Sequence, residues 1–327
     1  MRPPAVLDIR HITQFLPEAP FNFDATLHKP DHFPAADNIW QPGVRWQTML
    51  WQNQPLGLKF ENQGAIAQPE IRLTVWAKDE LSRSFLQELR AEINYRYNLL
   101  ADLTEFNQRF SDDAQLGPAI NRWLGMRPFS CNSLYEYLII AIVLQNATIR
   151  RSVQMMQALF EKYGTLLAYD GQELYCFWLP EVITRATEEA LRELKVGYRA
   201  KSIKRVSEAF SREDINELEL RFKPKEDQRA VLLGLYGIGP ASVGYILFDV
   251  FHHWGELTHI SPWEQKIYSK LFFETTPDEL VEVNELLALF EKRFSDYKML
   301  AVHYFWEDLF WRRKYEKLEW LEKLIRL

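Results

Sequence analysis

Cysteine is scarce in this chain, because Cys131 and Cys176 are the only two among 327 residues. They form no CxxC pair, so the sequence excludes a zinc ribbon and a cysteine-ligated iron–sulfur cluster and favours a reducing compartment. An excess of positive charge is missing too, since the formal net charge is −6. That balance excludes a protein that coats nucleic acid with a broad basic surface, but it is compatible with a local basic groove.

Long apolar runs and targeting segments are also missing. The longest apolar run, residues 137–144, is too short to span a bilayer. Residues 1–10 lack the apolar core of a signal peptide. We therefore expect no membrane contact and a cytoplasmic location. The chain has 47% hydrophobic and 26% charged residues, as ordinary globular proteins do, and its aromatic share of 14% supplies side chains for cores or stacking.

The N-terminal part, residues 1–99, has the pattern of a small β-rich domain. Residues 44–51 and 71–76 alternate between apolar and polar side chains, as half-buried strands do. Turn-forming residues at 54–57 and 62–64 are predicted to connect such strands in an antiparallel sheet. From residue 79 the period becomes helical, and the apolar face of this segment is expected to pack on the sheet.

Residues 100–327 have almost entirely helical period, which predicts a larger all-helical region. Helices are expected near residues 102–106 and 116–126, and over residues 134–144, 149–163, 180–188, 200–210, 225–235, 242–251, 276–294 and 299–327.

The most distinctive stretch, residues 232–251, has two apolar helical patterns on either side of Gly237-Ile238-Gly239-Pro240. The glycines allow positive φ and close approach of another backbone. Pro240 suits the first turn of a helix, where no amide donor is needed. The amides exposed at such a helix start favour an anion. The pattern predicts a phosphate-holding hairpin, and a plain helix–helix turn is the alternative.

Four segments together resemble the helix-hairpin-helix (HhH-GPD) DNA glycosylase superfamily, in its 3-methyladenine DNA glycosylase II and 8-oxoguanine DNA glycosylase branches. Residues 137–148 look like the family's apolar helix that ends in a Gln-rich turn. Residues 196–201 are similar to its Gly-aromatic-Arg-Ala-Lys segment. The hairpin and then residues 260–271, where the family carries its catalytic aspartate, complete the set. The resemblance implies an α+β fold with a small antiparallel sheet domain followed by two helical lobes.

The resemblance also implies a partner, double-stranded DNA with a damaged base, and a nucleoid association if the protein is bacterial. We expect a monomer that requires no cofactor. Carried over by position, the backbone amides that hold a DNA phosphate are those of Gly237, Gly239 and Ser242. The carbonyls that hold a structural K⁺ or Na⁺ are those of Leu233, Leu235 and Ile238.

Polar side chains of two further segments are expected at the DNA. Gln145 and Asn146 would enter the gap left by a flipped nucleotide or face the opposite base, since each offers donors and acceptors. The alternative is a capped loop, with Thr148 as N-cap and Gln145 in solvent. Arg199 and Lys201, in a dense basic run, would contact phosphates. A solvated charged face is the alternative for that run.

Counted from the hairpin, the family's catalytic aspartate falls on Ser261. The segment Ser-Pro-Trp-Glu keeps a capping box, with Ser261 as N-cap and Glu264 three residues later. A neutral serine cannot stabilise an oxocarbenium-like sugar, so Glu264 is the candidate substitute, with Asp249 as a less favoured one.

Two more positions near Ser261 bear on the chemistry. Trp263 is expected to stack on the extruded base or, alternatively, to pack against the C-terminal helix. Bifunctional members carry a nucleophilic lysine where this chain has Ala241, so β-lyase activity is not expected.

The function predicted from these residues is a monofunctional DNA glycosylase of base excision repair. A cationic alkylated purine is already a good leaving group and needs little charge stabilisation, which fits a site without the aspartate. The alternative is a catalytically inactive glycosylase-fold protein that binds damaged or bent DNA. A helical interaction protein without DNA binding is a third interpretation.

Overall fold

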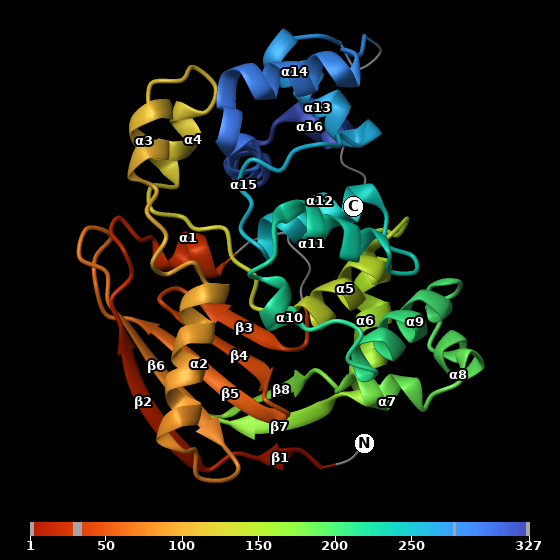
Figure 1. The fold of residues 1–327 in the computed structure, drawn as a ribbon. Coiled ribbons are helices and arrows are strands. Elements are labelled where there is room, and N and C mark those ends of the chain that lie inside the picture. The colour runs from red at the N-terminus through yellow and green to blue at the C-terminus, as the bar shows by residue number, and fades with distance from the viewer. Residues whose placement is uncertain (1–2, 29–34, 277–278, 325–327) are drawn as a thin grey trace.

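The computed structural model describes residues 3–28, 35–276 and 279–324, and these form two β-sheets with helices around them (Figure 1). The strands are β1 (Ala5–Val6), β2 (Ile9–Phe15), β3 (Asn38–Gln41), β4 (Val44–Trp51), β5 (Gln54–Asn62), β6 (Ile71–Ala77), β7 (Thr165–Tyr169) and β8 (Gln172–Cys176). The predicted α+β class, an N-terminal antiparallel sheet followed by a mainly helical region, is confirmed.

The helices begin with four in the first part of the chain, α1 (Phe23–Leu27), α2 (Arg83–Arg96), α3 (Thr104–Phe110) and α4 (Gly117–Arg122). The central part adds α5 (Leu134–Leu144), α6 (Ile149–Tyr163), α7 (Pro180–Thr184), α8 (Glu188–Glu193), α9 (Arg199–Ser211), α10 (Glu217–Leu220), α11 (Lys225–Leu233) and α12 (Pro240–Asp249). The last are α13 (Pro262–Phe273), α14 (Val283–Phe294), α15 (Lys298–Glu316) and α16 (Glu319–Leu324), with a short 3₁₀ helix at Ser295–Tyr297.

The larger sheet is antiparallel with strand order β2-β6-β5-β4-β3, and both of its faces are covered. On one face, α2 packs through Phe85 and Leu89 on Leu58 and Leu73, as the sequence predicted (Figure 1). The side chains that alternate with these point to the other face, where Trp46 and Trp76 lie in a second cluster with residues of β7 and β8.

The turn predicted at residues 54–57 is wrong, because these residues form the start of β5. Gln52 and Asn53 make the turn instead, with φ of 47° and 63°, and thus form a two-residue hairpin between β4 and β5. Pro55 is tolerated near the start of the strand. The other predicted turn, at residues 62–64, does follow the end of β5.

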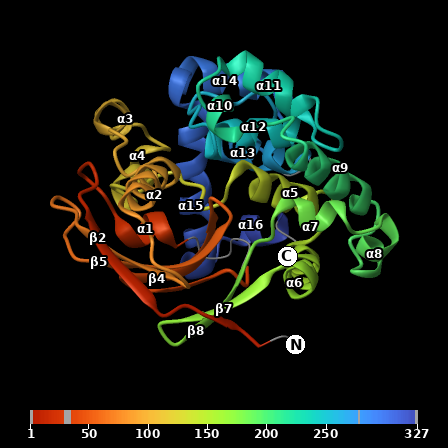
Figure 2. The ribbon, with the colours of Figure 1, turned by 60° about the horizontal axis from the view of Figure 1, so that its bottom comes forward.

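A hairpin of two strands, β7 and β8, interrupts the region that the sequence predicted to be all-helical. Its turn is Asp170-Gly171, with φ of 47° and 73°, and Asp-Gly between alternating apolar residues is a hairpin signal. β1 pairs in parallel with β7, which gives a three-stranded sheet of order β1-β7-β8. This sheet runs beside the larger one (Figure 2). Residues 165–176 are therefore strands and a turn, and not a helix, because they pair with each other and with β1.

Tyr169 joins the two sheets. Its hydroxyl donates to the Gln47 carbonyl at 2.7 Å, and the ring lies against the backbone of Gly57 in β5. A Cβ at Gly57 would come within 2.6 Å of three ring atoms, so only glycine fits there.

The described helices enclose two separate hydrophobic cores. One is built mainly by α5, α6, α9 and α12, and the other by α3, α4, α13, α14 and α15, which lie together at the top of Figure 1. Helix α12 belongs to both, with Val243, Ile246 and Leu247 in the first core and Phe248 in the second. None of the described helices is long and apolar enough to cross a membrane.

Helix ends follow the local capping residues. The predicted helices 134–144 and 149–163 coincide with α5 and α6, because Ser133 and Thr148 cap them. The predicted helix 180–188 is broken into α7 and α8, since Thr187 caps a new start. The predicted helix 276–294 begins only at Val283, and residues 277–278 lie outside the described part. The long terminal helix ends at Glu316, where Lys317 is left-handed.

A buried ion network ties α2 to the helical region. Arg221, just after α10, donates two hydrogen bonds to the Glu92 carboxylate at 2.6 and 2.7 Å. Burial alone would raise the pKa of Glu92, but the hydrogen bonds and charges of Arg221 and Arg96 lower it below its usual value. Glu217 accepts a hydrogen bond from Arg221 and another from the Leu134 amide, the first amide of α5, so the same network also fixes the start of that helix.

We predict that Gly57→Ala lowers the free energy of unfolding by about 2 kcal/mol or more, because the Tyr169 ring is pinned and cannot move away from the new methyl group. Denaturant unfolding followed by circular dichroism measures the change. Gly171→Ala is the control: its φ is positive, but no described atom lies within 4 Å of the added Cβ. It should cost only backbone strain, ~1 kcal/mol. Equal losses in the two variants would contradict the steric explanation.

Candidate functional site

The turn between α11 and α12 lies directly on α9. Gly237 has φ of +84°, and a Cβ built on it would come within 2.3 Å of the Ser202 hydroxyl oxygen. The turn is closed by the Ile238 amide, which donates to the Leu235 carbonyl at 3.1 Å, and the Ile238 side chain is buried. Gly237 is therefore required twice, for its positive φ and for the close approach to α9.

The N-terminus of α12 has the form of an anion site. Gly239 is the N-cap in extended conformation, Pro240 is the first helical residue, and among the described residues no side chain caps the helix. The amides of the first turn have no intrahelical acceptor. Gly237 is exposed, and Gly239 and Ser242 are half-exposed. The arrangement has the geometry that the predicted phosphate donors need, and their role stays a prediction.

The Gln145–Asn146 turn lies against this hairpin. The Gln145 side-chain amide donates to the Gly237 carbonyl at 2.8 Å, and its own backbone carbonyl accepts from the Arg199 guanidinium. Asn146 has φ of +48°, is exposed, and reaches the Tyr198 hydroxyl at 3.4 Å. Thr148 does cap α6, so the capped loop of the alternative is present, but Gln145 is engaged with the hairpin.

Arg199 and Lys201, both predicted to contact phosphates, lie differently at the start of α9. Arg199 is 7% exposed and its guanidinium holds backbone carbonyls, so it positions the turn. Lys201 is exposed, with its ammonium 4.8 Å from the centroid of the Tyr236 ring. Lys204, from the same basic run, donates to the carbonyls at the end of α7.

Two exposed aromatics on this face were missed as functional candidates. Tyr198 is 59% exposed, beneath the Arg199 guanidinium, and Tyr236 is 50% exposed beside Lys201. The sequence did contain a signal for them. Tyr198 directly precedes Arg199 in the Gly-aromatic-Arg-Ala-Lys segment, and Tyr236 directly precedes Gly237 of the hairpin. Aromatic and basic side chains that alternate on one surface are typical of nucleic-acid contact.

The start of α13 confirms the predicted capping box. The Ser261 hydroxyl accepts from the Glu264 amide at 3.3 Å, and the Glu264 carboxylate accepts from the Ser261 amide at 2.8 Å. The second carboxylate oxygen accepts from the Tyr245 hydroxyl at 2.5 Å. Glu264 is 5% exposed, so this carboxylate is buried and bound at both oxygens.

Side chains of α12 lie next to this carboxylate. Burial, together with the Glu264 carboxylate, raises the pKa of Tyr245 well above its usual value, so the phenol keeps its proton. Asp249, one turn further along α12, accepts a short hydrogen bond from the Tyr137 hydroxyl of α5. Ala241 is exposed in the first turn of α12, where bifunctional relatives would carry a lysine.

Trp263 packs against the C-terminal part of the chain, as the alternative proposed. Its ring stacks on Trp306 of α15, with centroids 4.6 Å apart and planes 9° from parallel. The residue is 36% exposed, so one part of this aromatic pair reaches the surface.

The carbonyls of Leu233, Leu235 and Ile238 are compatible with the predicted monovalent cation. Leu233 ends α11, where carbonyls have no intrahelical partner, and the other two belong to the turn. The Leu235 oxygen already accepts one hydrogen bond and keeps one lone pair. Among the described residues, no group of three or more His, Cys, Asp or Glu side chains is arranged to hold a metal ion.

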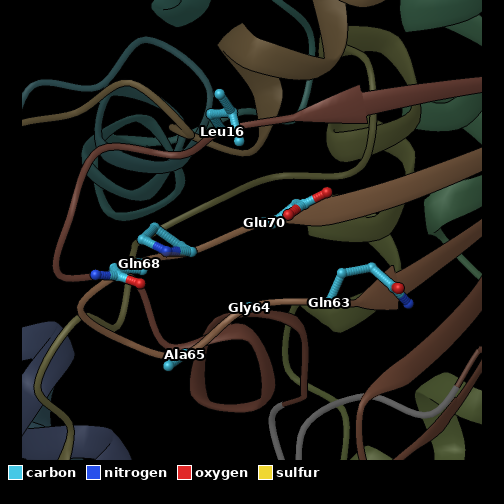
Figure 3. A pocket seen from close by; sticks show the side chains of 7 residues that line it. Leu16, Gln63, Gly64, Ala65, Gln68 and Glu70 are labelled. Carbon is cyan, nitrogen blue, oxygen red and sulfur yellow. The ribbon is translucent and has the colours of Figure 1, made fainter.

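A surface hollow of about 510 Å³ lies elsewhere, between the end of β2 and the loop from β5 to β6 (Figure 3). Its lining consists of Leu16, Gln63, Gly64, Ala65, Gln68, Pro69 and Glu70. We call the surface formed by the Gln145–Asn146 turn, the start of α9 and the turn before α12 the hairpin face. The hollow shares no residue with the hairpin face, and it holds one carboxylate and no basic side chain. We therefore assign the functional site to the hairpin face.

We predict that Gly237→Ala lowers the free energy of unfolding by about 3 kcal/mol, since it adds left-handed strain and a clash with α9. Gly239→Ala is the matched control two residues away. Its φ is −109°, and the described residues leave the space around its Cβ open to 4 Å. It should cost less than about 1 kcal/mol. Chemical denaturation measures both, and a stable Gly237→Ala protein would contradict the close approach.

Comparisons with known proteins agree with this geometry. The chain is similar to 3-methyladenine DNA-glycosylase from Archaeoglobus fulgidus, with a TM-score of 0.75 and 16% identity over 93% of this chain and 99% of that one. It is also similar to the Clostridium acetobutylicum 8-oxoguanine glycosylase/lyase in complex with double-stranded DNA. There the TM-score is 0.69 and the identity 17%, over 94% and 98% of the two chains. At these identities the likeness shows the fold.

Sequence relatives point the same way. One, from Methanothermobacter thermautotrophicus, is named "Probable N-glycosylase/DNA lyase" and is 25% identical over 203 residues, 56% of this chain and 64% of that protein. Another, the Saccharomyces cerevisiae N-glycosylase/DNA lyase, is 34% identical over 139 residues, 39% of this chain and 35% of that protein. The matches thus span about two thirds and one third of these relatives.

The family itself is matched over more than half of the chain. Residues 139–323 fit the description "HhH-GPD superfamily base excision DNA repair protein", and this range includes the Gln145 turn, the hairpin and Ser261. The resemblance seen in the four sequence segments is confirmed. The chain belongs to the HhH-GPD superfamily of base excision DNA repair proteins.

Proposed function

We propose that this protein is a monofunctional DNA glycosylase, which flips a damaged base, an alkylated purine, out of double-stranded DNA and hydrolyses its N-glycosidic bond. The observation that carries the proposal is the meeting of three separate segments on one face. The Gln145–Asn146 turn, the start of α9 and the hairpin before α12 are joined there by the hydrogen bonds of Gln145.

Each part of this face has a role in holding DNA. The amides at the start of α12 suit one phosphate, and the Lys201 ammonium suits another. Asn146 projects from the turn beside Tyr198. A side chain that fills the gap left by an extruded nucleotide has to project from the surface in this way. This local concentration of donors is compatible with the net charge of −6.

The chemistry proposed is hydrolysis of a bond that is already weak. In a cationic alkylpurine the electrons of the breaking bond neutralise the base, which leaves as a neutral molecule, so the enzyme supplies little further stabilisation of the leaving group. Ser261 contributes no charge, but Glu264 behind it places a carboxylate one helical turn away. We infer that this carboxylate stabilises the positive charge that develops on the sugar.

The proposed reaction ends with an abasic site and leaves the strand intact. Both sequence relatives are named N-glycosylase/DNA lyase. A lyase needs an amine nucleophile that forms a Schiff base with the sugar. This chain has Ala241 at the position where that lysine would stand, which supports hydrolysis alone.

A second candidate function is damage recognition without chemistry. The observation that favours it is the engagement of Glu264, which is 5% exposed and accepts hydrogen bonds from the Ser261 amide and the Tyr245 hydroxyl. In this case the protein would bind damaged or bent DNA through the hairpin face and leave the base in place.

We predict that Glu264→Gln reduces release of 7-methylguanine from an alkylated duplex by about 100-fold. Glutamine also closes a capping box, so α13 and the melting temperature should be preserved. Single-turnover assays measure the rate, and gel analysis without heat or alkali checks that the strand stays intact.

Two results would overturn parts of the proposal. Activity that appears only in Ser261→Asp would show that the natural protein is a binder. Robust release of neutral lesions, with none of 3-methyladenine or 7-methylguanine, would contradict the proposed substrate class.

We predict that Lys201→Ala makes the negative slope of log affinity against log salt concentration less steep by about 0.9, since one phosphate contact is lost. Lys204→Ala is the matched control from the same helix. Its ammonium is bound to the carbonyls that end α7, so the salt slope should stay unchanged while stability falls. Fluorescence anisotropy with a labelled duplex at several salt concentrations measures both, and an unchanged slope for Lys201→Ala would exclude its phosphate contact.

A further inference from the structure

A groove of about 230 Å³ lies between the edge strand β2 and helix α2, and it shares no residue with the hairpin face. Its floor consists of buried apolar side chains from β2, β6 and α2, among them Phe15, Leu73 and Leu89. Residues 11–13 of β2 form one wall, and a stripe of α2 forms the other. We name it the β2–α2 groove.

The α2 wall of this groove is basic at both ends. It consists of Arg83, Leu86, Gln87 and Arg90, whose spacing of three and four residues places them on one side of the helix. The side chains of Arg83 and Arg90 are exposed, and no carboxylate belongs to the lining of the groove. The groove is therefore complementary to a ligand that is apolar in the middle and negative on either side.

The two arginine charges are not cancelled within the described part of the chain. Arg90 donates through one terminal nitrogen to the Thr13 hydroxyl at 2.8 Å and to the Gln14 carbonyl at 2.6 Å, which are neutral acceptors. One carboxylate outside the lining, that of Glu80, is 79% exposed and lies 3.7 Å from the Nε2 of His11. Neither guanidinium is paired with a carboxylate of the described residues.

Strand β2 is an open edge of the larger sheet. β6 pairs with one side of it, and no described strand pairs with the other (Figure 1). Proteins usually blunt such an edge by making it short, by covering it, or with Pro and charged side chains. β2 is seven residues long, has no Pro, carries Arg10 as its only Arg or Lys, and has Ile12 56% exposed. This edge is therefore available for pairing.

An open strand edge beside a groove that a helix lines suits an extended peptide. The peptide backbone pairs with the strand, and every second side chain enters the groove. A second copy of this chain is a poor occupant, because a two-fold pair of β2 strands would set each copy's Arg83 and Arg90 opposite the same residues of the other. Like charges repel, so the charges favour an acidic segment of another protein.

We propose that the β2–α2 groove binds an extended acidic segment of a partner protein, which adds to the sheet as a strand next to β2. An apolar side chain of that segment fills the groove beside Leu86. The carboxylates two residues before and after it meet Arg83 and Arg90. The lengths match, because seven residues of helix rise about 10.5 Å and four residues of strand about 13 Å.

The test uses a labelled peptide, Ser-Glu-Val-Leu-Val-Glu-Ser, and a second peptide with Lys in place of each Glu. Fluorescence anisotropy should show that the wild-type protein binds the acidic peptide more tightly. Arg83→Glu should lower that affinity by about 5-fold or more and raise the affinity for the basic peptide. Glutamate suits the first turn of α2, so this variant should fold normally. Lys223→Glu, an exposed position between α10 and α11, makes the same charge change and should alter neither affinity.

Two further measurements test the groove and the added strand. Leu86→Trp fills the groove with a larger apolar side chain and should abolish binding of the acidic peptide, while thermal unfolding shows that the fold is kept. In the wild-type protein, the acidic peptide should slow hydrogen–deuterium exchange in residues 9–15. The same peptide with N-methylated backbone amides should neither bind nor slow exchange, because it cannot pair as a strand.

Each contrary result has its own meaning. If the wild-type protein fails to bind the acidic peptide, or binds the basic peptide equally well, the proposed ligand is wrong. Unchanged affinity in Arg83→Glu and in Leu86→Trp would place the peptide outside the groove and overturn the proposal. A wild-type dimer in analytical ultracentrifugation that becomes a monomer in Leu86→Trp would identify a second copy as the occupant. All of these readouts are independent of glycosylase activity.

Discussion

The close approach of the Gly237 backbone to Ser202 is the constraint on which the functional face depends. It sets the hairpin on α9 with no space for a side chain, and so α12 starts at a fixed place relative to the basic start of α9. The Gly237 carbonyl is then in position for the Gln145 side chain, whose own carbonyl is held by Arg199. Three segments that are distant in the sequence thus become one surface.

The burial of Arg199 changes the meaning of the basic run in which it lies. A guanidinium that holds backbone carbonyls beneath a surface orders the turn that we propose to meet DNA, although it contributes little to attraction at long range. In the proposed function, direct contact with DNA falls to exposed groups such as Lys201, Tyr198 and Tyr236. The acidic net charge of the protein is consistent with this division, because the face depends on placed donors rather than on a strong field.

Local signals in the sequence predicted much of the fold. Ser133 and Thr148 mark the starts of α5 and α6, and Ser261 with Glu264 forms the predicted capping box, because capping depends on neighbours in sequence. The β7–β8 hairpin was missed although Asp-Gly marked its turn, because apolar runs around it also suit a helix.

Tertiary contacts were outside the reach of such signals. Nothing in the spacing shows that the second oxygen of Glu264 meets Tyr245, or that Trp263 stacks on a helix 43 residues later in the sequence, at Trp306. The role of Gln145 as a link to the hairpin was likewise hidden, since its partner is a backbone carbonyl. These contacts depend on how helices pack.

Helix α12 belongs to both hydrophobic cores, and this has a consequence for the spacing between its two ends. Ten residues of helix span about 15 Å, so the anion site at its start and Asp249 at its end are held apart by a rigid spacer. Because side chains of the helix pack in both cores, neither end of the helix can shift without the other. Under the proposed function, the helix fixes the distance between a phosphate bound at its start and the groups at its far end. A single inserted residue would turn one end of the helix by about 100° relative to the other and would displace one end from its core.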